Sequence, residues 1–200
     1  MNSHRLDRQN AHLDLNDPEV QAVIERYQDY DEVPYISPKR PLKEWLDKVS
    51  DGRETLVPKR HMVRYEEDIL PGYLILLWRI GFGTFRNDSI YPKYFEYNYG
   101  INGQQALEEL LEKGYARELS ANESLTYLSA AQLKSRLKAE KISGYSSLNK
   151  DQLMMLIRSH FDEEALQDFF TLRGYELTES GQALLDRYPE VVDRHPKKNY

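Results

Sequence analysis

The sequence predicts a mainly α-helical protein with a few short β-strands. Apolar residues recur at helical spacing in several segments, and most of these segments follow a residue type that caps helices. Two short segments next to glycines, residues 115–118 and 175–177, have the length of strands instead. With 40% hydrophobic residues the chain can build a core, while 30% charged residues give it a polar surface.

The N-terminal part, residues 1–61, is expected to be a tail followed by short helices. Residues 1–15 are polar and mixed in charge, which favours a loose tail. Pro18 lies in the first turn of one predicted helix, and Pro41 opens a second one whose apolar face carries Trp45. We therefore expect Trp45 to pack in the core or between domains.

The middle part, residues 62–120, is predicted to contain a buried helix and an amphipathic one. Residues 69–80 are apolar nearly all round, which indicates a buried helix that begins near Pro71. Asn102 caps the next helix, and Gly114 ends it before a short strand. This order of elements resembles a winged-helix unit, so we predict a winged-helix-like middle region.

An aromatic segment spans residues 91–99, in which five of nine side chains are aromatic. Phe95, Tyr97 and Tyr99 alternate with polar residues, which favours a strand with one aromatic face, with a turn as the alternative. Such a face most often packs in a core or on a sheet. Two other roles stay open: beside Lys93 the rings are suited to stacking on bases, and an exposed aromatic surface is suited to a protein partner.

Residues 125–160 are predicted to form two short helices joined by an extended loop. Ser129 with Gln132, and Asn149 with Gln152, have the spacing of capping boxes, so each helix start is encoded locally. Apolar residues one turn apart give each helix a seam, and we expect the two seams to face each other with two loop residues closing the gap. The residues of this interface are Leu133, Leu137, Ile142, Leu148, Leu153, Leu156 and Ile157.

Charge separates this hairpin from the rest of the chain. Residues 128–158 contain six bases and two acids, a net charge of +4, whereas the whole chain carries −6. Lys134, Lys138 and Lys141 have the spacing of one helical stripe, and Lys150 opens the second helix beside a glycine- and serine-containing loop. A helix N terminus with free N–H groups, hydroxyls and a lysine is suited to phosphate. The alternative is a solvated hairpin whose lysines only maintain solubility.

The pattern Leu-x4-Leu-Lys-x2-Leu-Lys, a glycine-containing loop and Lys-Asp-x-Leu runs from Leu128 to Leu153. It resembles a SAP domain, a helix–extended loop–helix module that usually binds DNA. Residues 142–153 are also similar to the N-terminal module of the transcription terminator Rho. The positions that match those facing nucleic acid are Lys134, Lys138, Gly144, Tyr145, Ser146 and Lys150, and the basic stripe adds Lys141.

Two features depart from the usual SAP pattern. The first helix ends on Lys141-Ile142 instead of Gly-Leu, and the loop is longer. Some modules of this kind bind proteins rather than DNA, so a protein-interaction or scaffold module is the alternative. A second stretch, YPKYFEYNYGI…LLEKGYA, is similar to a segment of SAP-containing proteins from Gram-positive bacteria and their phages, which implies a context rather than an activity.

The C-terminal part, residues 161–200, is expected to be a helix–strand–helix region with a tail. Residues 161–172 have the pattern of an acidic amphipathic helix, and Thr178 caps the final helix after a short strand. Residues 195–200 are expected to be a solvated basic tail, and a contact of this tail with phosphate stays open.

No catalytic residue, metal site or cofactor is predicted, and we expect a protein that is not an enzyme. The chain has no cysteine, and its five histidines lack the spacing of metal ligands. Neighbouring carboxylates on a helix point in different directions and make poor acid–base pairs.

The predicted partner is double-stranded DNA, which the protein is expected to bind through the phosphate backbone. The N terminus lacks the apolar segment of a signal peptide, and the longest apolar run, residues 73–78, is too short to span a bilayer. We therefore expect a cytoplasmic protein without a membrane partner, whose oligomeric state the sequence does not indicate.

Overall fold

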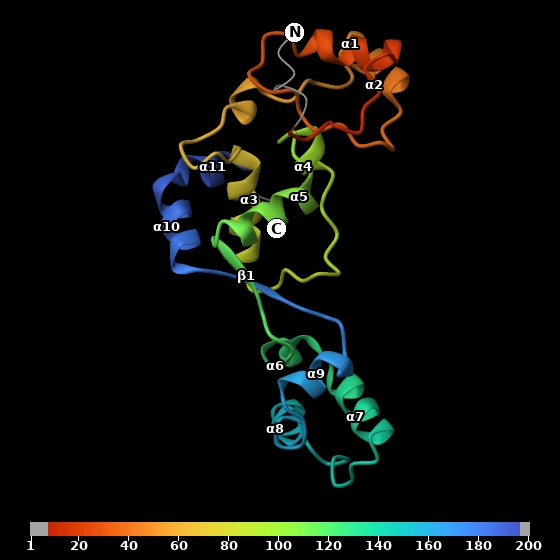
Figure 1. Cartoon of the computed structure of the whole chain (residues 1–200), viewed down its shortest axis with the longest axis vertical. Helices are drawn as coiled ribbons and strands as arrows, with labels where there is room; N and C mark the ends of the chain where they lie inside the picture. The colour runs from red at the N-terminus through yellow and green to blue at the C-terminus, as the bar shows by residue number, and fades with distance from the viewer. Residues whose placement is uncertain (1–7, 197–200) are drawn as a thin grey trace.

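The structure is a computed structural model that describes residues 8–196. It is mainly helical with one two-stranded antiparallel sheet, which confirms the predicted fold class (Figure 1). The helices are α1 (Pro18–Arg26), α2 (Leu42–Ser50), α3 (Pro71–Ile80), α4 (Tyr94–Tyr97), α5 (Gly103–Glu112), α6 (Ala121–Ser124), α7 (Ala130–Ala139), α8 (Lys150–His160), α9 (Glu163–Phe169), α10 (Glu179–Arg187) and α11 (Pro189–Arg194). The other described elements are the 3₁₀ turns η2 (Lys59–Met62) and η3 (Leu125–Tyr127) and the strands β1 (Ala116–Glu118) and β2 (Tyr175–Leu177).

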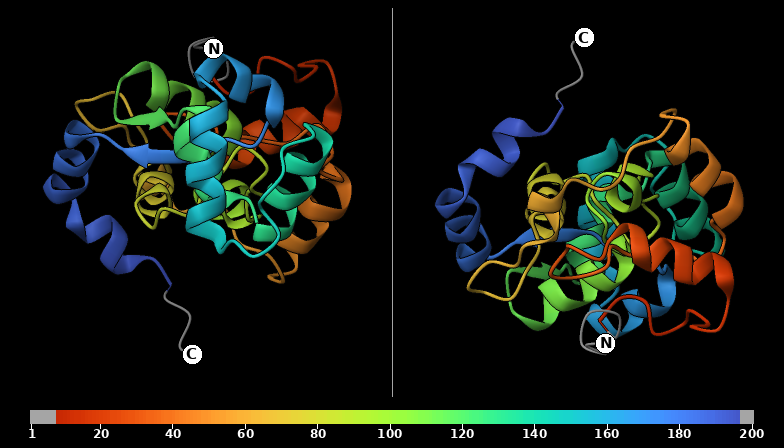
Figure 2. Two further views of the ribbon diagram at one scale, coloured as in Figure 1. Left: turned by 90° about the horizontal axis from the view of Figure 1, so that it is seen from below. Right: turned by 90° about the horizontal axis from the view of Figure 1, so that it is seen from above.

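Helix α3 is the centre of the larger hydrophobic cluster, in the part of the chain that we call the body (residues 8–116 and 175–196). It packs against α5 on one side and against α10 and α11 on another (Figures 1 and 2). All but two of its side chains are buried, which confirms the buried helix predicted to begin near Pro71. Trp45 of α2 is 5% exposed and belongs to the same cluster, as predicted.

The N-terminal segment from residue 8 is packed into the body, so the loose tail predicted for residues 1–15 is wrong for its described part. The side-chain oxygen of Asn10 accepts a hydrogen bond from the N–H of Ile36 at 2.9 Å. The side-chain nitrogen of Gln9 donates to the Gly100 carbonyl at 3.1 Å. Both side chains are buried, and burial through partners far away in the chain leaves no local pattern in the sequence.

The aromatic segment 91–99 contains the helical turn α4, so the strand that the sequence favours there is wrong. Phe95 and Tyr99 lie four residues apart and are both buried, which is the spacing of one helical face. Tyr97 packs against the Arg40 guanidinium, 4.4 Å from its ring centroid. The other tyrosines of the segment are half-buried, so most of this aromatic surface is used in packing.

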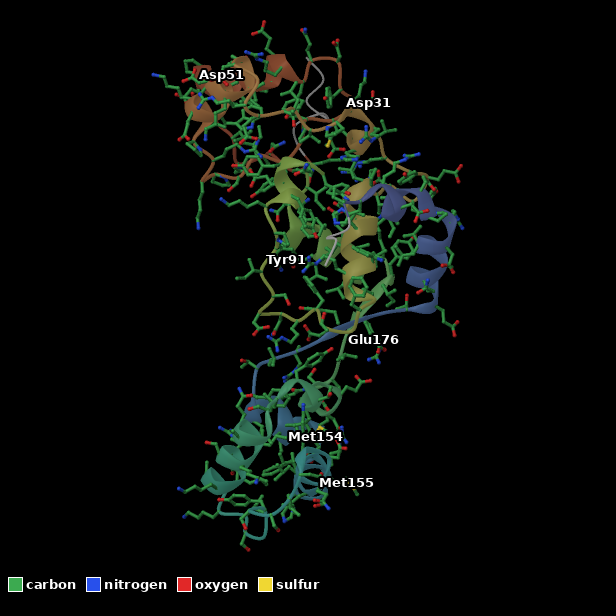
Figure 3. The ribbon with its side chains drawn as sticks, turned by 180° about the vertical axis from the view of Figure 1, so that it is seen from behind. Asp31, Asp51, Tyr91, Met154, Met155 and Glu176 are labelled. Carbon is green, nitrogen blue, oxygen red and sulfur yellow. The ribbon has the colours of Figure 1, made fainter. Side chains whose placement is uncertain are left out.

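A second hydrophobic cluster holds together residues 119–172, which we call the lobe. The lobe contains α6 to α9 and lies at one end of the molecule, apart from most of the body (Figure 1). Strand β1 leads into it and β2 leads out of it, and the two strands pair with Arg117 opposite Glu176. Glu176 therefore marks the connection, while Met154 and Met155 of α8 lie in the lobe (Figure 3).

The two hydrophobic clusters group the chain differently from the segments predicted from sequence. Residues from both the N-terminal and the middle segments contribute to the body cluster, together with α10 and α11. Helix α9, which is shorter than predicted, joins the predicted hairpin in the lobe. The predicted segments are 1–61, 62–120, 125–160 and 161–200. The predicted tail residues 1–7 and 197–200 lie outside the described residues. His195 is half-buried with its Nδ1 2.7 Å from the Tyr99 hydroxyl, so the prediction of a solvated tail is wrong for this residue.

Candidate nucleic-acid interface

Helices α7 and α8 form the predicted helix–loop–helix. Both capping boxes are present: Ser129 accepts a hydrogen bond from the N–H of Gln132, and Asn149 accepts one from the N–H of Gln152. The two helices meet through the predicted seams. Leu133, Leu137, Leu153 and Ile157 are fully buried, and Ile142, Leu148 and Leu156 pack against them half-buried.

The loop between the helices contains two residues of left-handed backbone conformation. Lys141 has a φ of 58° and Gly144 has a φ of 84°. Nothing lies within 4 Å of the position where a side chain on Gly144 would begin, so the glycine serves the turn and not a close contact. Tyr145 turns its side chain toward the second cluster and is half-buried, whereas Ser146 is exposed.

Two of the four predicted lysines bond to backbone carbonyls within the lobe. The Lys134 ammonium donates to the Ser146 carbonyl at 2.8 Å, which ties α7 to the loop. The Lys150 ammonium donates to the Thr126 carbonyl at 2.6 Å, in the turn that precedes α7. A carbonyl leaves the charge of a lysine in place and uses one of its three N–H donors, so both groups keep the capacity to attract a phosphate.

The other two predicted lysines are free. Lys138 and Lys141 are exposed, and the ammonium group of neither forms a hydrogen bond or an ion pair with any residue between 8 and 196. Lys134 and Lys138 lie one turn apart on α7, as their spacing predicts. The predicted place of Lys141 on the same helical stripe is wrong, because α7 ends at Ala139 and Lys141 has a left-handed backbone conformation in the loop. The structure therefore brings Lys134 to the loop that contains Gly144, Tyr145 and Ser146, whereas Lys150 extends toward η3.

The two arginines of the hairpin are used in packing. The Arg136 guanidinium lies 4.7 Å from the ring centroid of Phe169 in α9. Arg158 of α8 donates to the side-chain oxygen of Asn122 in α6 at 2.8 Å. These contacts hold α9 and α6 onto the hairpin. Two of the six basic residues that give residues 128–158 their net charge of +4 are therefore used in packing and do not contribute to a free basic surface.

Helix α9 also closes the lobe by capping α6. The Glu163 carboxylate accepts hydrogen bonds from the N–H groups of Ala121 at 2.6 Å and Asn122 at 3.0 Å.

Residues 119–172 contain seven acids and six bases, so the lobe as a whole carries −1. Sequence reasoning missed Asn122, Glu163 and Phe169 because each acts on a partner from another helix and belongs to no local motif. The lysine stripe is thus a local basic feature on a nearly neutral lobe.

No protein family, curated protein or solved structure matches this chain. The SAP and winged-helix resemblances therefore stay predictions that rest on the residues named above. Among residues 8–196, no helix combines the length and the apolar character needed to cross a membrane. In the same described part of the chain, no group of three or more histidines, cysteines or carboxylates is arranged to hold a metal ion.

Proposed function

We propose that this chain is a non-catalytic nucleic-acid-binding protein whose lobe contacts the phosphate backbone of double-stranded DNA. The contact between Lys134 and the Ser146 carbonyl is the observation that carries the proposal. It holds the basic stripe of α7 beside the exposed loop, so that neighbouring cations and a hydroxyl group are available to neighbouring phosphates.

Lys134 and Lys138 of α7, together with Lys141 just after its end, have the main role in this proposal. Lys138 and Lys141 make no internal contact that a phosphate would have to displace. At the start of α8 the Asn149 side chain accepts the hydrogen bond of the Gln152 N–H, and the backbone N–H of Lys150 is not part of this capping box. An anion at this helix N terminus is therefore favoured. Asp151 lies in the same first turn and opposes that anion. We therefore assign the start of α8 a supporting role.

The expected binding is weak, sensitive to salt and largely independent of sequence. Four lysines neutralise phosphates, but a contact between an ammonium and a phosphate does not distinguish one base pair from another. The lobe carries −1 and the chain −6, so the net charge opposes long-range attraction to DNA and only the local basic residues favour binding.

The test compares two double variants for binding to a short, blunt, labelled DNA duplex by fluorescence anisotropy. Lys138→Gln/Lys141→Gln is expected to weaken binding and to reduce the slope of log affinity against log salt by about 2, because each lost phosphate contact reduces it by about 1. Lys39→Gln/Lys43→Gln removes two exposed lysines of the body and is expected to bind like the wild type. Equal effects of the two double variants would contradict the proposal.

A protein partner at residues 91–99 is the alternative prediction. It requires an exposed aromatic patch, whereas Phe95 and Tyr99 are buried and the other three rings are half-buried. The DNA proposal is therefore the one that the described contacts support better.

A further inference from the structure

A cleft of about 870 Å³ opens in the body beside the end of α3. Its walls come from segments far apart in the chain: η2, the end of α3 with the turn after it, the aromatic segment 91–99, and the end of α11. The volume lies in the range of pockets that bind small organic ligands. None of the motifs considered for the lobe includes these residues.

Three arginines and no carboxylate line the cleft: Arg60, Arg79 and Arg194. Within residues 8–196 none of the three forms an ion pair, although eight other arginines do. Arg79 donates from Nη1 to the Tyr94 hydroxyl at 3.0 Å, and its Nε is buried without a hydrogen-bond partner. In a chain with a net charge of −6, this concentration of unpaired arginines favours an anionic ligand.

Together with burial, the arginines of the cleft contribute to lowering the pKa of its two histidines. Burial, together with the neighbouring Arg60 and Arg194, lowers the pKa of His61. Burial and the neighbouring Arg79 lower the pKa of His195. The positive charge of the cleft near neutral pH therefore comes from its arginines.

Aromatic rings form much of the remaining wall. The Trp78 ring meets that of Phe82 edge-on, with centroids 4.7 Å apart. Phe82 is 60% exposed, so this pair presents apolar ring surface to solvent. Tyr99 closes the other side through its hydroxyl, which lies 2.7 Å from Nδ1 of His195. A planar ligand ring that stacked here would bury the surface of Phe82.

The rim of the cleft also contacts the lobe. Phe82 lies in the turn after α3, and the carbonyl of the next residue, Gly83, accepts a hydrogen bond from the Tyr127 hydroxyl at 2.9 Å. Thr126, the neighbour of Tyr127 in η3, accepts the hydrogen bond from Lys150. The cleft and the basic residues of the lobe are thus joined through η3.

We propose that this cleft binds one nucleotide unit, with the base against Trp78 and Phe82 and the phosphate among the three arginines. Arginine matches phosphate in charge and hydrogen-bond geometry, and aromatic rings stack on any base. The unit comes from a free nucleoside monophosphate or from an unpaired nucleotide of a nucleic-acid strand. The second source rests on the proposed function, because the lobe would hold the paired part of that strand.

The test follows the fluorescence of Trp78 in the full-length chain during titration with adenosine monophosphate, inorganic phosphate, adenosine or a short oligothymidylate. Adenosine monophosphate is expected to quench the emission until the site is saturated, and Trp78→Phe is expected to abolish the change. Trp45, the other tryptophan, is buried away from the cleft lining and gives a constant background. Phosphate and adenosine alone are each expected to bind at least about tenfold more weakly, because each lacks half of the recognised unit.

Two cleft variants and one control make the test specific. Arg79→Gln and Phe82→Ala are each expected to weaken the binding of adenosine monophosphate roughly tenfold. Phe82 is exposed, so its removal is not expected to disturb folding. Arg53→Gln removes an exposed arginine outside the cleft and is expected to have no effect. The proposal is overturned if neither nucleotide probe quenches Trp78, or if phosphate binds as well as adenosine monophosphate.

The probes also identify the source of the nucleotide and separate this proposal from the function of the lobe. Quenching by adenosine monophosphate but not by the oligonucleotide indicates a free nucleotide, and stronger quenching by the oligonucleotide indicates a strand. Lys138→Gln/Lys141→Gln is expected to lose duplex binding and to keep the binding of adenosine monophosphate. If wild type fails to bind the blunt duplex but its Trp78 is still quenched, the cleft proposal stands and the lobe proposal fails.

Discussion

At the scale of the residue, Lys141 holds a backbone conformation that favours glycine. Its φ of 58° is left-handed, which costs a residue with a side chain about 1 kcal/mol or more. The conformation ends α7, because the N–H of Ile142 bonds to the Leu137 carbonyl at 3.0 Å and the N–H of Lys141 bonds to the Lys138 carbonyl at 3.0 Å. The position at which the usual SAP pattern has glycine is therefore the position at which this backbone is strained.

Replacing Lys141 separates that strain from the charge. Lys141→Gly is expected to raise the free energy of unfolding by about 0.5–1 kcal/mol, measured by urea denaturation, because relief of the left-handed strain outweighs the added flexibility of the unfolded chain. Lys141→Gln removes the same charge, keeps the conformation and is expected to give no such gain. Both variants are expected to weaken duplex binding to a similar degree. A Lys141→Gly protein that is less stable than the glutamine variant would refute this explanation.

His61 is expected to make the stability of the body depend on pH. Burial lowers the pKa of His61 in the folded state, so the unfolded state takes up the proton first as the pH falls through about 6.5. Stability is therefore expected to be full above that pH and to decrease as the pH falls toward the folded-state pKa. His61→Gln keeps a donor for the Asn98 carbonyl, which now lies 2.6 Å from Nδ1, and removes the titration.

Thermal denaturation between about pH 7 and pH 5 tests this effect of His61. The decrease in melting temperature from about pH 7 to pH 5 is expected to be smaller in His61→Gln than in the wild type. His160→Gln, at an exposed position on α8, serves as the control and is expected to retain the wild-type dependence. Identical pH profiles of the melting temperature for wild type and His61→Gln would show that His61 does not contribute to the pH dependence of stability.

At the scale of the element, the predicted hairpin is stabilised by helices on either side of it in the chain. The Glu163 carboxylate joins the start of α9 to the first N–H groups of α6. Glu163→Gln is expected to lower the free energy of unfolding by about 1–2 kcal/mol, because it replaces charge-assisted hydrogen bonds at a helix N terminus with neutral ones. Glu164→Gln changes the same charge at an exposed neighbouring position and is expected to have little effect. Chemical denaturation of the two variants side by side tests the difference, and equal stabilities would contradict it.

Elements that are specified by neighbouring residues were predictable from the sequence. The capping boxes of α7 and α8, the start of α3 at Pro71 and the cap of α5 at Asn102 are local patterns, and each is confirmed. The segment 91–99 was predicted wrongly because alternating and helical spacing both place Phe95 and Tyr99 on one face. The contacts of α9 with α6 and α7 were not predicted, since both depend on how separate helices pack.

At the scale of the whole molecule, the chain has two hydrophobic clusters joined by the pair β1 and β2. The two strands were predicted separately, but their pairing was not, because the entire lobe lies between them in the sequence. The cleft was unpredictable for the same reason, since Arg60, Arg79 and Arg194 meet only after the body has folded. Helical spacing correctly predicted that Lys134 and Lys138 share a face of α7, but it did not predict that the helix ends before Lys141.

The measurement that most directly tests DNA binding by the lobe is the affinity of the full-length wild type for a blunt duplex across a salt series. Four lysine–phosphate contacts predict a slope of log affinity against log salt of about −3.6. The Lys138→Gln/Lys141→Gln variant is expected to show a slope of about −1.8 while remaining as stable as the wild type. Absence of duplex binding at low salt, or a slope that the double variant leaves unchanged, would contradict a DNA-binding role for the lobe.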